Sequence, residues 1–489
     1  MNRPAATVDH LPGEKPVRAW RDRDLFVDIL PACDLGNSSF LVGDSGRRAA
    51  VVIDPTRDVP RYLAALDRSD LALRWVLDTH LHADFVSGGK ELADLGGGQF
   101  GLSDQVAATF PHNALGEQDM IEVGAARLTL IRTPGHTPEH VSYLLHDVRG
   151  RPRVLFSGGS LMAGTAARPD LLGPHFTNAL VREEFTTLHD RYRGLAGSVA
   201  VLPTHAGGSF CGVGARASPL TSLAKERRTN PLLRSRDLGS FFAAYLSDQP
   251  YPSYYGRSRA INLAGGRPLG AAIPELPGLG ASEVEGFRRE PGVTILDIRS
   301  PERFEKAHIP GSLSIPSDGP LSAWVGWLRP EEESFVVVDG DPVARRAAQV
   351  GLLRIGYDRL RGYLEGGIPA YETAGFHTAS TPRVSMAGVK TVMERGTPFT
   401  VLDVRNPDEA VKIHVPGAVN IPLPHLERDA NAALTRDLPV FVHCESGYRA
   451  GIAASLLERM GFGDVWHVTD GPERWSGSTA RTGHRRRSH

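Results

Sequence analysis

Asp78-Thr79-His80-Leu81-His82-Ala83-Asp84 directly follows the apolar run Trp75-Val76-Leu77, and this transition decides how the first part of the chain folds. A short apolar run that ends in polar residues predicts a β-strand followed by a loop. His80 and His82 are two positions apart, so an extended backbone would turn both imidazoles to the same side. Neutral imidazole binds zinc or ferrous iron, and Asp84 would either bind the same ion or orient a histidine that does. The stretch therefore predicts a metal site at a strand end.

Two more histidines follow later strands in similar turns that contain proline. Thr133-Pro134-Gly135-His136 comes after the predicted strand 127–131, and Pro203-Thr204-His205 comes after the predicted strand 198–202. Predicted strands at 50–53, 74–77 and 154–156 also end shortly before Asp, His, Gly or Pro. Binding residues commonly lie on loops that a rigid scaffold positions. We therefore expect the metal ligands to be drawn from His80, His82, Asp84, His136 and His205, all at one rim of an α/β sandwich.

Length and composition limit the classes of function. A chain of 489 residues is long enough for about three domains. The formal net charge of −1 provides no overall basic field for nucleic acid or an anionic membrane, which favours small-molecule partners. Three widely spaced cysteines and no apolar run of about 18 residues predict a cytoplasmic protein without a disulfide framework or a membrane span. The polar segment 481–489 is expected to be a solvated tail.

The second half of the chain contains a duplication. Leu296-Asp297-Ile298-Arg299 matches Leu402-Asp403-Val404-Arg405, and His308-Ile309-Pro310-Gly311 matches His414-Val415-Pro416-Gly417. Both matches have the same offset of 106 positions (403−297 and 414−308), which indicates two copies of one supersecondary plan. Each copy alternates strand and helix signals and predicts a parallel sheet. Gly- and Pro-rich breaks at 260–282 and 375–382 predict domains at 24–262, 281–375 and 385–478.

The second copy contains a reactive cysteine candidate. In Val442-His443-Cys444-Glu445-Ser446-Gly447-Tyr448-Arg449, a strand enters a short loop that begins a helix. This geometry directs backbone N–H groups and a helix N-terminus at the sulfur and favours a thiolate.

The corresponding cysteine is missing from the first copy. The offset of 106 aligns Cys444 with Val338, and a slip of one residue aligns it with Asp339. Neither residue offers a thiol, so this copy is expected to be structural or to act in docking. The Asp–Arg pair is present both in the copy that has the cysteine and in the copy that lacks it. We therefore expect each pair to be an ion pair that stabilises the fold.

The histidine motifs resemble those of the metallo-β-lactamase superfamily, within it the persulfide dioxygenase and glyoxalase II branch. Residues 36–42, 52–55 and 226–231 add to the resemblance, which implies an αββα sandwich with its site at the rim. Members of the family typically have a histidine where this chain has Phe85. A persulfide dioxygenase is expected to hold one ferrous iron with two histidines, here His80 and His136, and an aspartate at the position of Gly159.

Three accounts of the altered site remain open. His82 or Asp84 replaces the missing third ligand, a different metal binds through three histidines, or the site has lost its activity. The resemblance implies one divalent metal, with Fe(II) favoured and Zn(II) as the alternative. The missing ligands disfavour a centre with two metals.

Residues 387–477 resemble rhodanese sulfurtransferases, both in the cysteine loop and in Asp470-Gly471-Pro472-Glu473-Arg474-Trp475. The resemblance implies a persulfide on the catalytic residue Cys444. Main-chain donors of the substrate-binding residues would stabilise its sulfur anion, and these residues are Glu445, Ser446, Gly447, Tyr448 and Arg449. The loop of six residues favours sulfur transfer over phosphatase chemistry, which uses a longer loop.

Together, the two resemblances imply metal-dependent oxidation of a glutathione-like persulfide, combined with sulfur transfer through Cys444. The expected small-molecule partners are the persulfide, its thiol, and thiosulfate or sulfite, and a homo-oligomer is left open. One alternative is a zinc-dependent thiol-ester hydrolase of the glyoxalase II type. Another is a sulfur-relay scaffold whose metal site has degraded.

Overall fold

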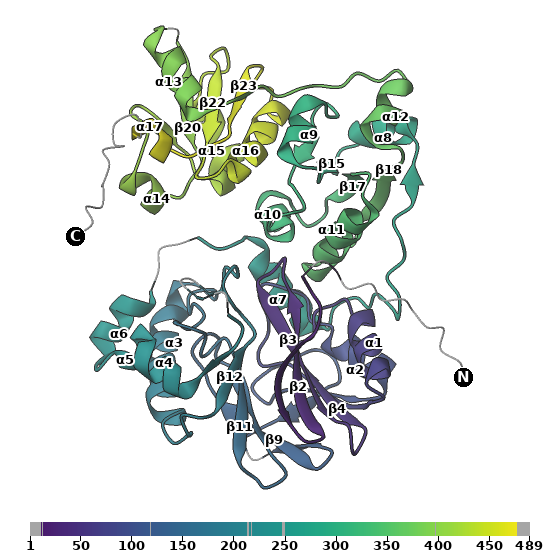
Figure 1. The fold of residues 1–489 in the computed structure, drawn as a ribbon, viewed down its shortest axis with the longest axis vertical. Coiled ribbons are helices and arrows are strands. Elements are labelled where there is room, and N and C mark those ends of the chain that lie inside the picture. Colours follow the sequence, from purple (N-terminus) through teal and green to yellow (C-terminus); the bar gives the residue numbers. More distant parts are fainter. Residues whose placement is uncertain are drawn as a thin grey trace, which may run out of the picture. The chain divides into compact units, whose positions relative to one another are not determined.

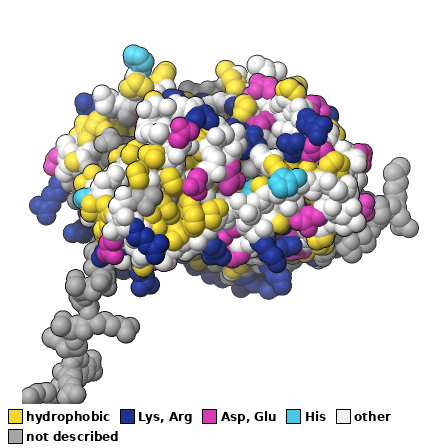
Figure 2. Space-filling view, turned by 90° about the horizontal axis from the view of Figure 1, so that it is seen from above, with side chains coloured by type: hydrophobic (Ala, Val, Ile, Leu, Met, Phe, Trp, Pro, Cys, Tyr) yellow, Lys and Arg dark blue, Asp and Glu magenta, His cyan; other side chains and the backbone are white. Residues whose placement is uncertain are grey.

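The computed structural model describes residues 11–476 except 12, 118, 213–214, 217, 247–249 and 397, so the predicted tail lies outside the described residues. The chain forms two compact units. The first comprises Met1–Glu275 and Gln349–Asp358, and the second comprises Leu276–Ala348 and Arg359–His489. No helix among the described residues is both long enough and apolar enough to cross a bilayer. Basic and acidic side chains are interspersed on the face seen in Figure 2, as a net charge of −1 would suggest.

The first unit contains two mixed β-sheets. In the described residues, the first sheet has seven strands in the order of the sequence, antiparallel from β1 to β4 and parallel from β4 to β7. Its strands are β1 (Val17–Asp22), β2 (Leu25–Ala32), β3 (Asn37–Asp44), β4 (Ala49–Ile53), β5 (Ala72–Leu77), β6 (Gln99–Ser103) and β7 (Asn113–Leu115). The second has the order β13-β12-β11-β10-β9-β8. Its strands are β8 (Met120–Val123), β9 (Ala126–Arg132), β10 (Val141–His146), β11 (Pro152–Gly158), β12 (Ala200–Pro203) and β13 (Thr221–Ser222).

The two sheets pack face to face and are covered by helices on both outer sides. Apolar residues of both sheets, such as Val42, Leu130 and Phe156, form the central core. Helices α1 (Pro60–Arg68) and α2 (Gly89–Gly96) cover the first sheet. Helices α3 (Pro174–Thr186), α4 (Leu223–Thr229), α5 (Pro231–Arg234) and α6 (Leu238–Tyr245) lie on the side of the second (Figure 1). The predicted αββα sandwich is confirmed. Its layers are stabilised because each face of each sheet buries apolar side chains, and burial of each such side chain contributes about 1.5–3 kcal/mol.

Helix α7 (Tyr254–Ala264) holds the histidine loop from outside the sandwich. The Tyr254 hydroxyl donates to the carbonyl of Asp84 at 3.1 Å, and the Asn262 amide donates to the carbonyl of His82 at 2.8 Å.

The N–H of Val86 donates to the carbonyl of Arg354 at 2.7 Å, and the fully buried Arg354 guanidinium pairs with Glu14, Asp34 and Asp58. Arg354 belongs by sequence to the first repeat, yet Gln349–Asp358 folds with the first unit.

The second unit contains the two copies, each built on a five-stranded sheet in which every recorded pair is parallel. The first sheet has the order β14-β18-β17-β15-β16 and the second the order β19-β23-β22-β20-β21. Strands of the first copy are β14 (Gly278–Leu279), β15 (Val293–Asp297), β16 (Leu313–Ser314), β17 (Ser334–Val338) and β18 (Leu360–Leu364). Strands of the second are β19 (Arg383–Val384), β20 (Thr400–Asp403), β21 (Val419–Asn420), β22 (Val440–His443) and β23 (Val465–Val468). The parallel sheets expected from the sequence are confirmed.

Helices flank both sheets of this unit, as Figure 1 shows for the second copy. Those of the first copy are α8 (Ala281–Arg288), α9 (Pro301–Lys306), α10 (Leu321–Leu328), α11 (Pro342–Arg354) and α12 (Gly367–Thr373). Those of the second are α13 (Met386–Glu394), α14 (Pro407–Lys412), α15 (Leu426–Ala433), α16 (Tyr448–Arg459) and α17 (Glu473–Ser476).

Strand register decides which residue of the first copy corresponds to Cys444. Asp297 pairs with Val338 in the first sheet, and its counterpart Asp403 pairs with His443 in the second. Val338 therefore corresponds to His443, and Asp339 corresponds to Cys444. The two paired residues are one position closer in sequence in the second copy than in the first. The alignment of Cys444 with Val338 is therefore wrong.

The predicted ion pairs of the two copies are present. Arg299 binds Asp297 with a closest distance of 2.6 Å, and Arg405 binds Asp403 in the same way. Each guanidinium also donates to a carbonyl in the turn ahead, of Ala307 and Ile413. The pairs therefore tie a strand end to the following turn, which explains why they occur in both copies.

Candidate metal centre and cysteine loop

Three histidines from separate strand ends meet in the interior of the first unit. His80 follows β5, His136 lies between β9 and β10, and His205 follows β12. Each offers one ring nitrogen, and these nitrogens lie within 4.8 Å of one another. All three rings are at most 2% exposed. A cluster of buried imidazoles is costly unless each polar nitrogen has a partner.

The outer nitrogens of the three rings are each held by an acceptor. His136 Nδ1 lies 2.7 Å from the carbonyl of Arg168, and His205 Nδ1 lies 3.0 Å from Asn37 Oδ1 and 3.1 Å from Asp84 Oδ2. His80 Nδ1 lies 2.8 Å from the Thr79 hydroxyl, which itself donates to Asp54. Every Nδ1 therefore serves as a hydrogen-bond donor, which leaves the Nε2 side of each ring to bind a metal.

The inner nitrogens have the geometry of metal ligands. His80 Nε2 and His205 Nε2 are 3.3 Å apart, and His136 Nε2 is buried without a hydrogen-bond partner. Two lone pairs facing each other repel unless a cation lies between them. Nitrogens at about 2.0–2.1 Å from one tetrahedral ion are about 3.3 Å apart. These three residues therefore fit a divalent metal, whereas the cluster offers no carboxylate for a two-His-one-carboxylate site.

The electrostatics of the cluster keep the imidazoles of His80 and His136 neutral. Burial, together with the nearby His205, lowers the pKa of His136 to about 3. Burial and the neighbouring histidines also lower the pKa of His80 well below its usual value. Neutral imidazole is the form that binds a metal, so no proton needs to be displaced from these two rings at neutral pH.

His82 and Asp84 take other positions, although each also belongs to a group of potential ligands with His205. His82 Nε2 lies 3.1 Å from Asp54, and its ring stacks on Phe85 at a centroid distance of 4.1 Å. Burial disfavours the charged ring, but the contact with Asp54 raises the pKa of His82 overall. Asp84 accepts from His205 and Asn37, so it orients His205 through the outer nitrogen. The structure thus brings His205 to His80 and His136, while the ligand set itself stays a prediction.

In the second unit, the loop after β22 bends back on its own sulfur. Gly447 N–H donates to Cys444 Sγ at 3.1 Å, and Gly447 adopts a left-handed conformation with φ of 91°. Cys444 is 1% exposed, whereas Glu445 and Ser446 are exposed. A backbone N–H directed at sulfur stabilises its anion, as the sequence predicts.

The last two residues of the loop are engaged by other parts of the unit. Arg449 forms a two-pronged ion pair with Glu409 of α14, at 2.6 and 2.7 Å. The Tyr448 hydroxyl donates to the carbonyl of Pro316 in the first copy at 3.0 Å. These contacts indicate that both side chains brace the loop, while their predicted role in substrate binding stays a prediction.

Comparison with known proteins follows the same division of the chain. The rhodanese-like domain family matches residues 281–374 and 386–478. YrkF of Bacillus subtilis, named as a candidate sulfur carrier protein, is 35% identical over 24% of this chain and 63% of its own length. Persulfide dioxygenase ETHE1 of Mus musculus is 27% identical over 40% of this chain and 70% of that protein. A hydroxyacylglutathione hydrolase of Pseudomonas putida is 30% identical over 43% of this chain and 86% of that protein.

A solved structure extends the similarity across both units. The crystal structure of a metallo-β-lactamase from Staphylococcus aureus matches 70% of this chain and 98% of its own, with a TM-score of 0.62 and 27% identity. This chain is a persulfide dioxygenase-like protein of the metallo-β-lactamase fold, fused to two rhodanese-like domains. Domains of these two kinds support a role in sulfur metabolism.

The metallo-β-lactamase-fold domain contains site residues that the sequence motifs did not single out. Asp54 accepts hydrogen bonds from Thr79 and Thr204, and His140 stacks on His80 at a centroid distance of 4.9 Å. His140 Nε2 accepts from the N–H of Gly159 at 2.9 Å. His140 ends the stretch Thr133-Pro134-Gly135-His136-Thr137-Pro138-Glu139-His140, and this spacing was the available signal for it.

Gly159 is required by the packing around the candidate ligand His136. A Cβ atom at this position would lie 2.6 Å from His136 Cδ2 and 2.9 Å from the Cβ of Ala167. Gly159→Ala is therefore expected to lower the free energy of unfolding by about 1–3 kcal/mol through overpacking and to reduce metal occupancy. Urea unfolding and metal analysis measure both effects. Gly194→Ala is the control because nothing lies within 4 Å of its Cβ, and equal behaviour of the two variants would contradict the explanation.

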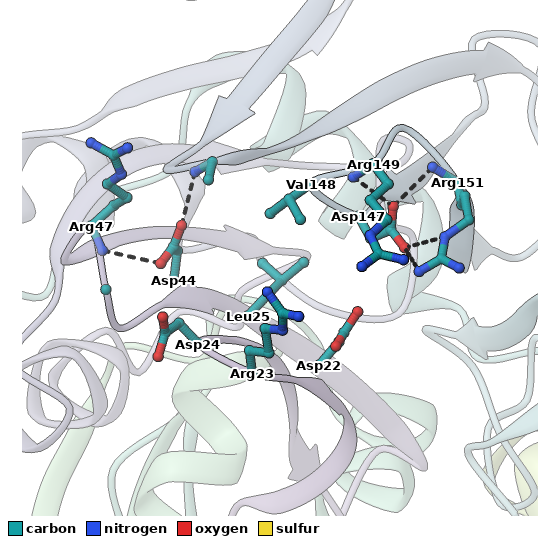
Figure 3. Close-up of a pocket in the computed structure, with 12 residues that line it drawn as sticks. Asp22, Arg23, Asp24, Leu25, Asp44, Arg47, Asp147, Val148, Arg149 and Arg151 are labelled. Carbon is teal, nitrogen blue, oxygen red and sulfur yellow. Dashed lines mark hydrogen bonds and ion pairs between the residues drawn. The ribbon is translucent and has the colours of Figure 1, made fainter.

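A surface pocket of about 390 Å³ lies away from the histidines (Figure 3). It is lined by the turns before β2, β4, β9 and β11, and none of the clustered histidines is among its lining residues. Two of its acidic groups already have partners, since Asp147 pairs with Arg151 and Asp44 accepts from the backbone of Arg47. This pocket is therefore distinct from the candidate metal centre.

Proposed function

We propose that this protein oxidises a low-molecular-weight, glutathione-like persulfide at the centre formed by His80, His136 and His205, and transfers sulfur through Cys444. The observation that carries the proposal is the set of three histidine ring nitrogens that converge within 4.8 Å, in a chain that also holds a cysteine loop of the rhodanese type. The similarity to persulfide dioxygenases and rhodanese-like domains supports it.

The residues of the first unit prepare the centre. Hydrogen bonds to Thr79, Arg168 and Asp84 hold the three rings in one tautomer and one orientation. Burial excludes bulk water, which strengthens the attraction between a cation and an anionic persulfide. When bound, a redox-active metal such as Fe(II) would activate dioxygen for the oxidation, in which persulfide, dioxygen and water yield sulfite, a thiol and two protons.

The second unit would use the sulfite produced. A sulfite lone pair attacks the outer sulfur of the Cys444 persulfide, so that a new S–S bond forms while the bond to Sγ breaks. The electron pair of the broken bond remains on Sγ as thiolate, and thiosulfate leaves. Gly447 N–H, 3.1 Å from Sγ, is placed to stabilise the charge that develops there.

Oxygen consumption tests the first reaction. Protein reconstituted with Fe(II) or Zn(II) is mixed with glutathione persulfide in an oxygen electrode, and sulfite is measured alongside. Oxygen uptake that requires both metal and persulfide is expected. A protein that holds metal but consumes no oxygen would refute the dioxygenase half of the proposal.

A zinc-dependent thiol-ester hydrolase is the second candidate. Three neutral imidazoles are a common ligand set for catalytic zinc, and the 30% identity to a hydroxyacylglutathione hydrolase favours this reading. The same protein preparations, assayed with a glutathione thiol ester, separate the candidates. Hydrolysis that depends on zinc, without oxygen uptake from persulfide, would select the hydrolase.

A further inference from the structure

The copy that lacks the cysteine packs along the helix that carries the cysteine loop. Ser455 of α16 accepts from the N–H of Ser314 at 3.0 Å, and Arg459 donates to the carbonyl of Gly311 at 2.8 Å. Glu458 faces His308 at 3.2 Å. Both copies belong to the same compact unit. Helix α16 begins at Tyr448, so its position determines where the loop ends.

A chain of contacts continues from the first copy to the sulfur itself. Glu305 of α9 binds His467 Nδ1, and His467 Nε2 lies 2.9 Å from the carbonyl of Gly447. Gly447 N–H in turn donates to Cys444 Sγ. Glu305 and His467 are 6% and 3% exposed, so both are shielded from competing water.

The hydrogen-bond partners of His467 show where its ring carries a hydrogen. A carbonyl oxygen only accepts, so His467 Nε2 must carry a hydrogen to bind Gly447. The carboxylate of Glu305 holds the ring in place from its other side, through Nδ1. Without the carboxylate, the ring could turn and lose the bond to Gly447. Gly447 could then rotate, because glycine has more backbone freedom than any other residue.

We propose that Glu305 is a positioning residue for Cys444, acting from the first copy through His467 to hold Gly447 N–H on the sulfur. The copy without a cysteine is then half of the sulfurtransferase site. This inference rests on the proposed sulfur chemistry of Cys444. The other charged group at Glu305 is Arg383, whose Nε lies 3.3 Å from the second carboxylate oxygen.

The test is Glu305→Ala in the full-length protein, with two readouts. One is the rate of Cys444 alkylation by iodoacetamide at neutral pH, assigned to Cys444 by peptide mass spectrometry. The other is kcat and KM for sulfur transfer from thiosulfate to cyanide. We expect alkylation and kcat each to fall about tenfold while KM changes less than twofold. Glu302→Ala is the matched control, on the same helix but 60% exposed, and should stay within twofold of the native protein.

His467→Gln separates positioning from simple support of the interface. This variant removes the ring that links Glu305 to Gly447, so Glu305→Ala should have no further effect on alkylation in this background. Native alkylation in Glu305→Ala, or an equal tenfold loss in both backgrounds, would overturn the proposal. Alkylation requires no sulfur transfer, so a native protein without transferase activity would refute the proposed function and leave this test valid.

Discussion

Cys444→Ser is expected to abolish sulfur transfer, with a loss of more than about 10³-fold in kcat. A serine hydroxyl is not ionised at neutral pH and cannot form the S–S bond that carries sulfur between donor and acceptor. The thiosulfate:cyanide assay measures the loss directly. Mass spectrometry adds a second measurement, because the native protein should gain the mass of one sulfur atom after incubation with thiosulfate and the variant should not.

Two comparisons make the Cys444 experiment specific. Cys33→Ser removes an exposed thiol of the first unit and should leave sulfur transfer unchanged. Metal content should be the same in all three proteins, since Cys444 belongs to the second unit and the histidine cluster to the first. Transfer activity that persists in Cys444→Ser would show that another group carries the sulfur.

His136→Ala is expected to lower the metal content from close to one ion per chain to less than about 0.1 after dialysis against a weak chelator. Loss of an orienting partner typically lowers metal affinity about 10–100-fold. Removal of one of three nitrogen ligands should have a larger effect, because it leaves the site incomplete. His205→Ala and His80→Ala should behave in the same way. Elemental analysis gives the stoichiometry, and the absorption spectrum of a Co(II) derivative reports the ligand geometry.

His82→Ala is the matched comparison, because His82 lies on the same loop but faces Asp54. It should retain most of the metal. If His82→Ala lost metal as readily as His205→Ala, the three-histidine set would be wrong, and the set with His82 and Asp84 would replace it.

Much of the fold could be predicted from local sequence patterns. The predicted strands at 50–53, 74–77 and 127–131 correspond to β4, β5 and β9, because apolar runs that end in polar turns are local signals. The duplicated Asp–Arg and His–Pro–Gly motifs predicted two related domains with parallel sheets, and both are matched by the rhodanese-like domain family. The cysteine loop could be located because its chemistry lies within six consecutive residues.

The details of the sites depend on residues far apart in the chain. His82 is two residues from His80 and His205 is 125 residues away, yet His205 Nε2 faces His80. His205 faces His80 because Asp84 orients its ring, whereas the ring of His82 contacts Asp54 instead. Likewise, only strand register identifies Asp339 as the counterpart of Cys444.

The sequence by itself thus determined the classes of domain, the cluster of candidate ligands and the reactive cysteine, since each is written in short motifs. The tertiary structure alone decided which histidine nitrogens converge, why Gly159 excludes a side chain, and how Glu305 reaches the cysteine loop. Glu305 and His467 are 162 residues apart and share no motif. Their contact depends on packing between the two copies. Contacts between residues so far apart in the chain leave no periodic pattern in a single sequence.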